Sequence, residues 1–121
     1  MARTSVTPVQ MVANTSAEVV AGTTIDSTLV TAGVVIADGN TSKLLIEVAN
    51  SAGGAKNVTV NAGAYPPALY SGQGNLVRSV GASKTHKFGP LDGMRFSQED
   101  GSITIDFETG TTGTISAFLL P

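Results

Sequence analysis

The residues from 102 to 108 alternate strictly between apolar and polar side chains, and this pattern constrains the fold more than any other feature. Ile103, Ile105 and Phe107 stand at every second position, with Ser, Thr, Asp and Glu around them. Side chains at every second position of a β-strand share one face, so the segment predicts a strand with one buried face. Glu99-Asp100-Gly101 precedes it, and a three-residue loop ending in a left-handed glycine is typical of a β-hairpin. The segment therefore indicates antiparallel β-structure.

Composition agrees with this fold class. Val, Ile and Thr make up 34 of the 121 residues, and these branched side chains fit a pleated surface better than a helix. No window shows convincing helical spacing, and one turn at residues 18–21 is the most helix we expect. Candidate strands lie at residues 18–25, 28–37, 43–49, 57–61, 76–80, 85–88, 94–98, 102–108 and 114–120. The expected core residues are Leu44, Ile46, Val48, Val58, Val60, Ile103, Ile105, Phe107, Ile115 and Ala117. Eight or nine short strands predict an antiparallel β-sandwich or a jelly-roll-like barrel.

The chain divides into an N-terminal arm and one domain. Residues 1–15 predict an extended arm because they are polar, lack acidic side chains and include Pro8. Residues 16–121 predict a single β-sandwich domain. So polar an arm is expected either to be disordered or to dock on a neighbouring molecule, and we favour docking. On this interpretation the arm contributes nothing to the core, and its deletion leaves the domain folded.

Charge and hydropathy argue against several classes of partner. The net charge is −2 and only 13% of the residues are charged, which gives no reason to expect nucleic acid or a membrane surface as a partner. No apolar run approaches the length of a membrane span, and the first residues lack the apolar core of a secretory signal. The absence of cysteine removes disulfides and thiolate metal sites. We expect the protein to be made and folded in a cytoplasm.

The inventory of catalytic residues is nearly empty. His86 is the only histidine, and Lys84, Thr85 and Lys87 beside it indicate an exposed position. Asp106 and Glu108 share the outer face of one predicted strand, and two carboxylates can hydrolyse a glycosidic bond. A solvated strand face explains the same two acids equally well. We therefore expect no enzymatic activity, no cofactor and no metal.

Two segments are candidate contact surfaces. The loop at residues 62–75 holds both tyrosines, with Pro66 and Pro67 stiffening it, and long loops of this kind are often functional. Alternatively, Tyr65 and Leu69 only cap one end of the sandwich. The arm at residues 2–11 is the second candidate. The residues expected to contact a shell or another copy are Arg3, Val6, Pro8, Met11, Tyr65, Pro66, Pro67, Leu69 and Tyr70.

The second half of the chain resembles a family of small β-rich proteins. The similar segments, in order, are residues 63–68, 72–80, 88–91, 95–107, 111–114 and 120–121. They resemble the capsid decoration, or cement, proteins of tailed bacteriophages. The resemblance implies a sandwich or jelly-roll-like fold that binds the outer face of an assembled shell, and it brings no catalytic residue. It implies the major capsid protein and copies of the chain itself as partners, in a homo-oligomer such as a trimer, and a place on the capsid exterior.

Other functions stay open at this point. A carbohydrate-binding or adhesive β-sandwich is one alternative, although the chain has no Trp, two Tyr and four Phe to line a sugar platform. A tail or baseplate component is another, because nothing in the residues separates it from a capsid protein. A glycosidase that uses Asp106 and Glu108 is the distant enzymatic alternative.

Overall fold

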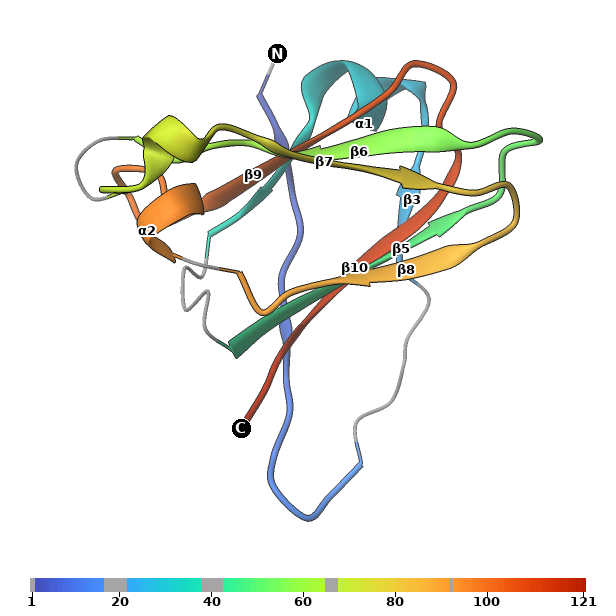
Figure 1. The fold of residues 1–121 in the computed structure, drawn as a ribbon. Helices are drawn as coiled ribbons and strands as arrows, with labels where there is room; N and C mark the ends of the chain where they lie inside the picture. Colours follow the sequence, from blue (N-terminus) through green and yellow to red (C-terminus); the bar gives the residue numbers. More distant parts are fainter. Residues whose placement is uncertain (1, 17–21, 38–42, 65–67, 92) are drawn as a thin grey trace.

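Two five-stranded sheets pack face to face, which confirms the predicted all-β sandwich (Figure 1). This computed structural model describes residues 2–16, 22–37, 43–64, 68–91 and 93–121. Its strands are β1 (Thr4–Ser5), β2 (Val9–Gln10), β3 (Thr23–Ile25), β4 (Val34–Ile36), β5 (Leu44–Asn50), β6 (Lys56–Val60), β7 (Leu76–Val80), β8 (Thr85–Phe88), β9 (Ile103–Phe107) and β10 (Gly113–Leu119). None of the helices in the described ranges is long and apolar enough to cross a membrane.

The sheets are mixed rather than purely antiparallel. Sheet A has the order β1-β4-β9-β6-β7, and sheet B has the order β2-β10-β5-β8, with β3 also paired to β10. β2 and β3 occupy different stretches of β10, next to Phe118–Leu119 and Gly113–Ile115 respectively. Among the described pairs, only β1 with β4 and β2 with β10 are parallel. Both exceptions come from the N-terminal segment.

The core lies between the two sheets, where the alternation of the strands predicts it. All ten residues expected in the core are buried. Strand β5 shows the pattern most regularly, because Leu44, Ile46 and Val48 are buried while the residues between them are partly exposed. The period of two therefore assigned the inner face correctly in β5, β6, β9 and β10.

Two short helices replace predicted strand segments. Helix α1 (Ser27–Ala32) stands where the first part of the 28–37 strand was expected, and only β4 remains of that strand. Asp26 caps this helix, since its side chain accepts a hydrogen bond from the Leu29 N–H at 2.8 Å. Helix α2 (Gly93–Phe96) likewise takes the place of the strand expected at 94–98. The possible helical turn at 18–21 and much of the 18–25 strand lie outside the described residues.

The predicted turn before β9 is present, although it follows a helix rather than a strand. Gln98 accepts a hydrogen bond from the Gly101 N–H at 2.9 Å, and its own N–H donates to the Ser102 carbonyl at 2.8 Å. The Asp100 carboxylate accepts from the Ser102 N–H at 3.0 Å and from the Ser102 hydroxyl at 2.6 Å. Gly101 has a φ of 82°, which confirms the left-handed position.

Replacing Gly101 by Val is expected to destabilise the protein by about 1–3 kcal/mol, because a branched side chain is strained at positive φ. No atom lies within 4 Å of a Cβ at this position, so strain in the backbone is the main cause. Asp100→Asn retains an acceptor oxygen for Ser102 and is the matched mild change. Chemical denaturation of both variants measures the difference, and equal stabilities would contradict the assigned turn.

The N-terminal arm lies across the edges of both sheets of its own sandwich (Figure 1). The Thr4 N–H donates to the Gly33 carbonyl at 2.9 Å, and the Met11 N–H donates to the Leu119 carbonyl at 2.8 Å. Between them, the Val6 side chain is only 4% exposed and belongs to the hydrophobic core. The expectation that the arm contributes nothing to the core is therefore wrong. A polar arm can dock because its backbone supplies most of the bonds and only Val6 needs to be apolar.

The two lateral sides of the sandwich are bridged differently. On one side the arm passes from β1 at the edge of sheet A to β2 in sheet B. On the other side, β7 and β8 form the outer edges of the two sheets and follow one another in the chain. Within the described residues, no strand pairs with the outer edge of β7 or of β8. These two strands are therefore the long open edges of the molecule.

Candidate functional site

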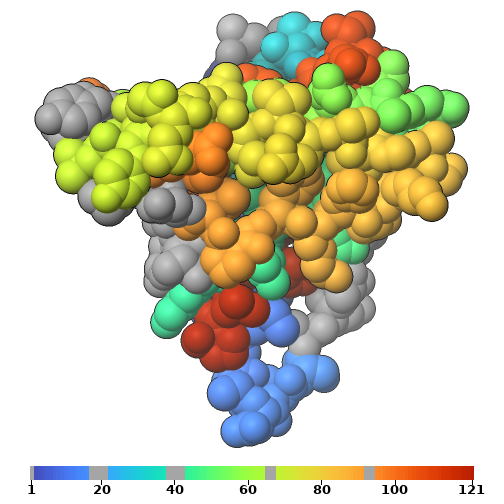
Figure 2. All heavy atoms as spheres, in the orientation of Figure 1, coloured from blue at the N-terminus to red at the C-terminus, as the bar shows by residue number. Residues whose placement is uncertain are grey.

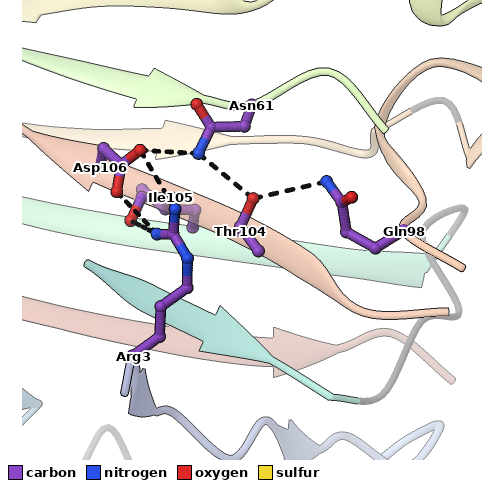
Figure 3. Close-up of polar contacts among 6 residues, drawn as sticks. All are labelled: Arg3, Asn61, Gln98, Thr104, Ile105 and Asp106. Carbon is purple, nitrogen blue, oxygen red and sulfur yellow. Dashed lines mark hydrogen bonds and ion pairs between the residues drawn. The ribbon is translucent and has the colours of Figure 1, made fainter. Parts of the chain in front are cut away.

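A polar cluster on the outer face of sheet A fixes the arm (Figure 3). Arg3 Nη1 donates to Asp106 Oδ1 at 2.6 Å, and Arg3 Nη2 donates to Asp106 Oδ2 at 3.3 Å. Asn61 Nδ2 donates to the same carboxylate at 2.8 Å and to the Thr104 hydroxyl at 3.2 Å. Gln98 Nε2 lies 3.5 Å from the Thr104 hydroxyl at the end of the row. The Arg3–Asp106 pair thus links the start of the chain to β9, far away in sequence.

Gly33 makes room for this ion pair. It follows α1 with a φ of 80°, and a Cβ placed on it would collide with the Arg3 guanidinium and the Asp106 carboxylate. Glycine therefore serves two needs here, a positive φ after a helix and an open path for Arg3. The second need is visible only when the arm and β9 are placed side by side.

The ion pair makes the docking of the arm sensitive to acid. Partial burial raises the pKa of Asp106, but hydrogen bonds from Arg3 and Asn61 and the charge of Arg3 outweigh it and hold the pKa below its usual 3.8. A lowered pKa in the folded state means that the carboxylate stabilises the fold above pH 3.8. This contribution is lost as the pH falls through the folded-state pKa. Other carboxyl groups also change the stability of the protein in this pH range, so a variant of Asp106 is needed to isolate its contribution.

We expect Asp106→Asn to lower stability at neutral pH and to match the unmodified protein more closely below about pH 3.8. The measurement is the free energy of unfolding of both proteins from pH 7 to pH 2. The effect at neutral pH is modest, since both side chains of the pair are partly exposed to solvent. A difference between the two proteins that does not change with pH would contradict the role given to the carboxylate.

The acids considered for glycoside hydrolysis are both engaged by cations. Asp106 is held by Arg3, and Glu108 lies 3.5 Å from Lys56 Nζ. A shallow open hollow lies beside the cluster, and neither acid lines it. Its lining residues are Ala2, Arg3, Val35, Ala64, Gln98, Glu99, Asp100, Ser102 and Thr104. Among the described residues, no group of three or more His, Asp or Glu side chains is placed to hold a metal ion.

The described residues among those predicted to contact a partner differ in how far they are exposed. In the arm, Arg3 is paired and Val6 is buried, while Pro8 and Met11 are half-buried. Tyr65, Pro66 and Pro67 lie outside the described residues. Leu69 is 54% exposed and Tyr70 is 48% exposed, so these two present apolar surface to solvent.

The loop that carries Leu69 and Tyr70 is held in place by α2. Arg95 Nε donates to the Gly74 carbonyl at 3.1 Å, and Arg95 Nη2 donates to the Asn75 carbonyl at 3.3 Å. The Asn75 side chain in turn accepts from the Ala62 N–H at 2.7 Å. The exposed loop residues therefore sit on a fixed support, which is what an interface residue needs to bind without a large ordering cost.

Leu69 and Tyr70 border a wider exposed surface built by the two open edge strands. We call it the β7–β8 face and define it as Leu69, Tyr70 and residues 76–88. Its exposed side chains include Leu69, Tyr70, Val77, Arg78, Lys84, His86 and Lys87. In Figure 2 the segment from residue 69 to 91, coloured yellow-green to orange, spreads across the front of the molecule. The face combines apolar and basic groups.

The corner between β7 and β8 is fixed by a buried asparagine. Asn50 Nδ2 donates to the Val80 carbonyl at 3.0 Å, to the Gly81 carbonyl at 3.3 Å and to the Gly54 carbonyl at 3.1 Å. Asn50 Oδ1 accepts from the Ala52 N–H at 2.9 Å. One side chain thus holds the end of β7 and a neighbouring loop against β5. The turn that joins the two edge strands is therefore positioned by the core.

Leu69 and Tyr70 of this face were predicted from the sequence, but residues 76–88 were not, because the two candidate contact surfaces were the tyrosine-containing loop and the arm. One signal was available, since the chain contains no Asp or Glu between Glu47 and Asp92. Arg78, Lys84 and Lys87 all fall within that interval. The chain is slightly acidic as a whole, so the acid-free interval marks a local positive surface.

Comparison with known proteins gives no match, neither to a family model nor to a curated protein or a solved structure.

Proposed function

We propose that this protein is a structural component of a bacteriophage virion that decorates the outside of the capsid and stabilises it. The sequence resemblance to decoration proteins supports this proposal, and the all-β sandwich agrees with it. The observation that carries it in the fold is the β7–β8 face, a fixed and exposed surface with apolar side chains at Leu69, Tyr70 and Val77. Exposed apolar side chains that gather on one rigid surface are typical of binding sites.

The partners under this proposal are the major capsid protein and copies of the chain itself, for example in a trimer. A protein that binds only the assembled shell stabilises that shell by mass action. Neither catalysis nor a cofactor is needed for such a role, and we propose none. The proposed location is the capsid exterior.

The contact is assigned to the β7–β8 face rather than to the arm. Arg3 and Val6 are already engaged within their own sandwich, one in an ion pair and the other in the core. Using them to bind a shell would first require the arm to detach. Leu69 and Tyr70 need no such rearrangement, and aromatic side chains often dominate the binding energy of interfaces.

Co-sedimentation with phage heads tests the proposal. Heads emptied of DNA and stripped of this protein are expected to bind it, while unassembled capsid subunits are not. The double variant Leu69→Ser and Tyr70→Ser is expected to weaken binding at least tenfold, since each lost apolar anchor is worth about 1–2 kcal/mol. Val12→Ser is the matched control, because Val12 is 61% exposed and lies outside the face.

Three results would argue against decoration. Absence of binding to heads would overturn it, and binding to tails in place of heads would favour the tail or baseplate alternative. Binding to a glycan array without binding to heads would favour the carbohydrate-binding alternative. The hollow lined by Gln98, Glu99 and Asp100 offers polar groups for a sugar, but its described lining residues include no aromatic side chain.

A further inference from the structure

We infer that the outer edge of β7 binds an extended, acidic peptide segment, which adds to sheet A as a further strand. The inference names the chemistry of the partner at the β7–β8 face, and to that extent it rests on the proposed function. Three features of the described residues support it: the direction of the edge backbone groups, the charge of the rim and the exposure of Val77.

The backbone of β7 directs two residues outward. In β6, the backbone of Asn57 faces β9, because the Asn57 carbonyl accepts a hydrogen bond from the Glu108 N–H at 3.0 Å. Successive residues of an antiparallel strand alternate their backbone groups between the two neighbours, so Val58 faces β7. Val58 is paired with Arg78 in register.

By the same alternation, Val77 and Ser79 turn their N–H and C=O groups away from β6. In agreement with this, the Val77 carbonyl accepts a hydrogen bond from the Arg78 side chain, at 3.0 Å from Nη1, and not from β6. A peptide that pairs here would use the outward N–H groups of Val77 and Ser79 and would displace this local side-chain contact. Such strand addition is a common mode of peptide recognition.

The rim around this edge is basic. On β7, Arg78 stands two residues from Leu76 and two from Val80, whose side chains face the core. The Arg78 side chain is nevertheless exposed. On β8, His86 and Lys87 are exposed as well. Lys87 lies 4.0 Å from Glu47, and no carboxylate is within ion-pair distance of Arg78 or Lys84 in the described ranges. Acidic side chains on an added strand would find complementary charge here.

A second copy of this chain is a poor occupant of the same edge. Charged side chains on edge strands oppose pairing between like edges, and two copies would bring Arg78 close to Arg78. Nucleic acid would also meet positive charge, but it has no backbone N–H and C=O pattern to continue the sheet, and the whole chain carries a net charge of −2. An acidic peptide can both continue the backbone hydrogen bonds of the sheet and pair with the basic side chains at its edge.

Synthetic peptides test the inference without a capsid. The probe is a blocked eight-residue peptide in which Glu alternates with Val and Thr, labelled for fluorescence anisotropy. One control peptide has Lys in place of Glu, and a second keeps the Glu residues but has Pro at alternate positions, which removes the N–H groups that pair with the edge. The acidic peptide is expected to bind, and both controls are expected to bind at least tenfold more weakly.

Two variants of the protein locate the site. Val77→Pro removes an outward N–H without disturbing the bonds to β6, since proline is tolerated where the N–H of an edge strand faces solvent. Arg78→Glu reverses the charge of the rim. Each is expected to weaken binding of the acidic peptide about tenfold, and thermal unfolding confirms that each is folded. Ser79→Pro serves the same purpose if Val77→Pro does not fold.

Hydrogen exchange supplies an independent readout. Binding of the acidic peptide is expected to slow exchange at Val77 and Ser79 and to leave Val12 unchanged. Equal binding of the Lys and Glu peptides, protection elsewhere, or self-association of the protein in place of peptide binding would overturn the inference. Binding of a single-stranded oligonucleotide in preference to the peptide would overturn it as well.

Head binding separates this inference from the proposed function. If Val77→Pro loads onto heads as well as the unmodified protein does, strand addition at β7 is wrong and decoration stands. If the acidic peptide binds but heads do not, the edge site stands and decoration falls.

Discussion

Val6→Asp is expected to release the N-terminal arm and to lower the free energy of unfolding by about 2–4 kcal/mol. Val6 is 4% exposed, and burial of a Val side chain contributes about 1.5–3 kcal/mol. The carboxylate cannot enter the core, so the arm detaches and its backbone bonds to β4 and β10 are lost as well. Detachment also frees the backbone of the arm, and this gain in entropy limits the total loss.

Deletion of the first ten residues is expected to cost about the same as Val6→Asp, because a detached arm and an absent arm leave the same sandwich. Thr7→Asp is the matched control, since Thr7 is the next residue in the chain and is exposed. Urea denaturation compares the three proteins. Equal stability of Val6→Asp and Thr7→Asp would show that the arm does not dock on its own domain in solution.

Phe107→Ala is expected to lower the free energy of unfolding by about 3–5 kcal/mol, which is the usual cost of removing a buried phenyl ring. Phe107 is buried near the end of β9, where it pairs with Val58 of β6. Its loss leaves a cavity between the two sheets, and the melting temperature is expected to fall by more than about 10 °C.

Val77→Ala provides the control for Phe107→Ala, because Val77 is 46% exposed on an edge strand. It is expected to change stability by less than about 0.5 kcal/mol. Calorimetry of both variants makes the comparison. A small effect of Phe107→Ala, similar to that of the control, would mean that β9 does not face the core in the way the structure shows.

The long strands were predictable because their information is local. In β5 and β9 the alternation of apolar and polar residues settles which side chains face the core, whatever the neighbouring strand is. Strands β7 and β8 were predicted with the bounds that the structure gives them. Gly101 is a similar case, since a tight loop requires a left-handed residue wherever the loop is placed.

The short helices were less predictable because so few residues define them. Helix α1 spans six residues, too few to show a periodic apolar pattern, and α2 spans four. Asp26 and Gly33, which stand at the two ends of α1, are residue types that often begin and end a helix. The sequence-based prediction did not use them, because the β-branched residues that follow Asp26 favoured a strand.

The sequence by itself determined the fold class, the inner faces of the strands and the turn before β9, since each depends on neighbouring residues and on the period of a strand. Only the tertiary structure decided where the arm lies, because the arm's bonds are formed with β4, β9 and β10, which are distant in the chain. It also decided which edges stay open, because an edge is defined by the strands that pair with it and not by its own residues. The candidate binding face at β7 and β8 is therefore a property of the assembled sheets.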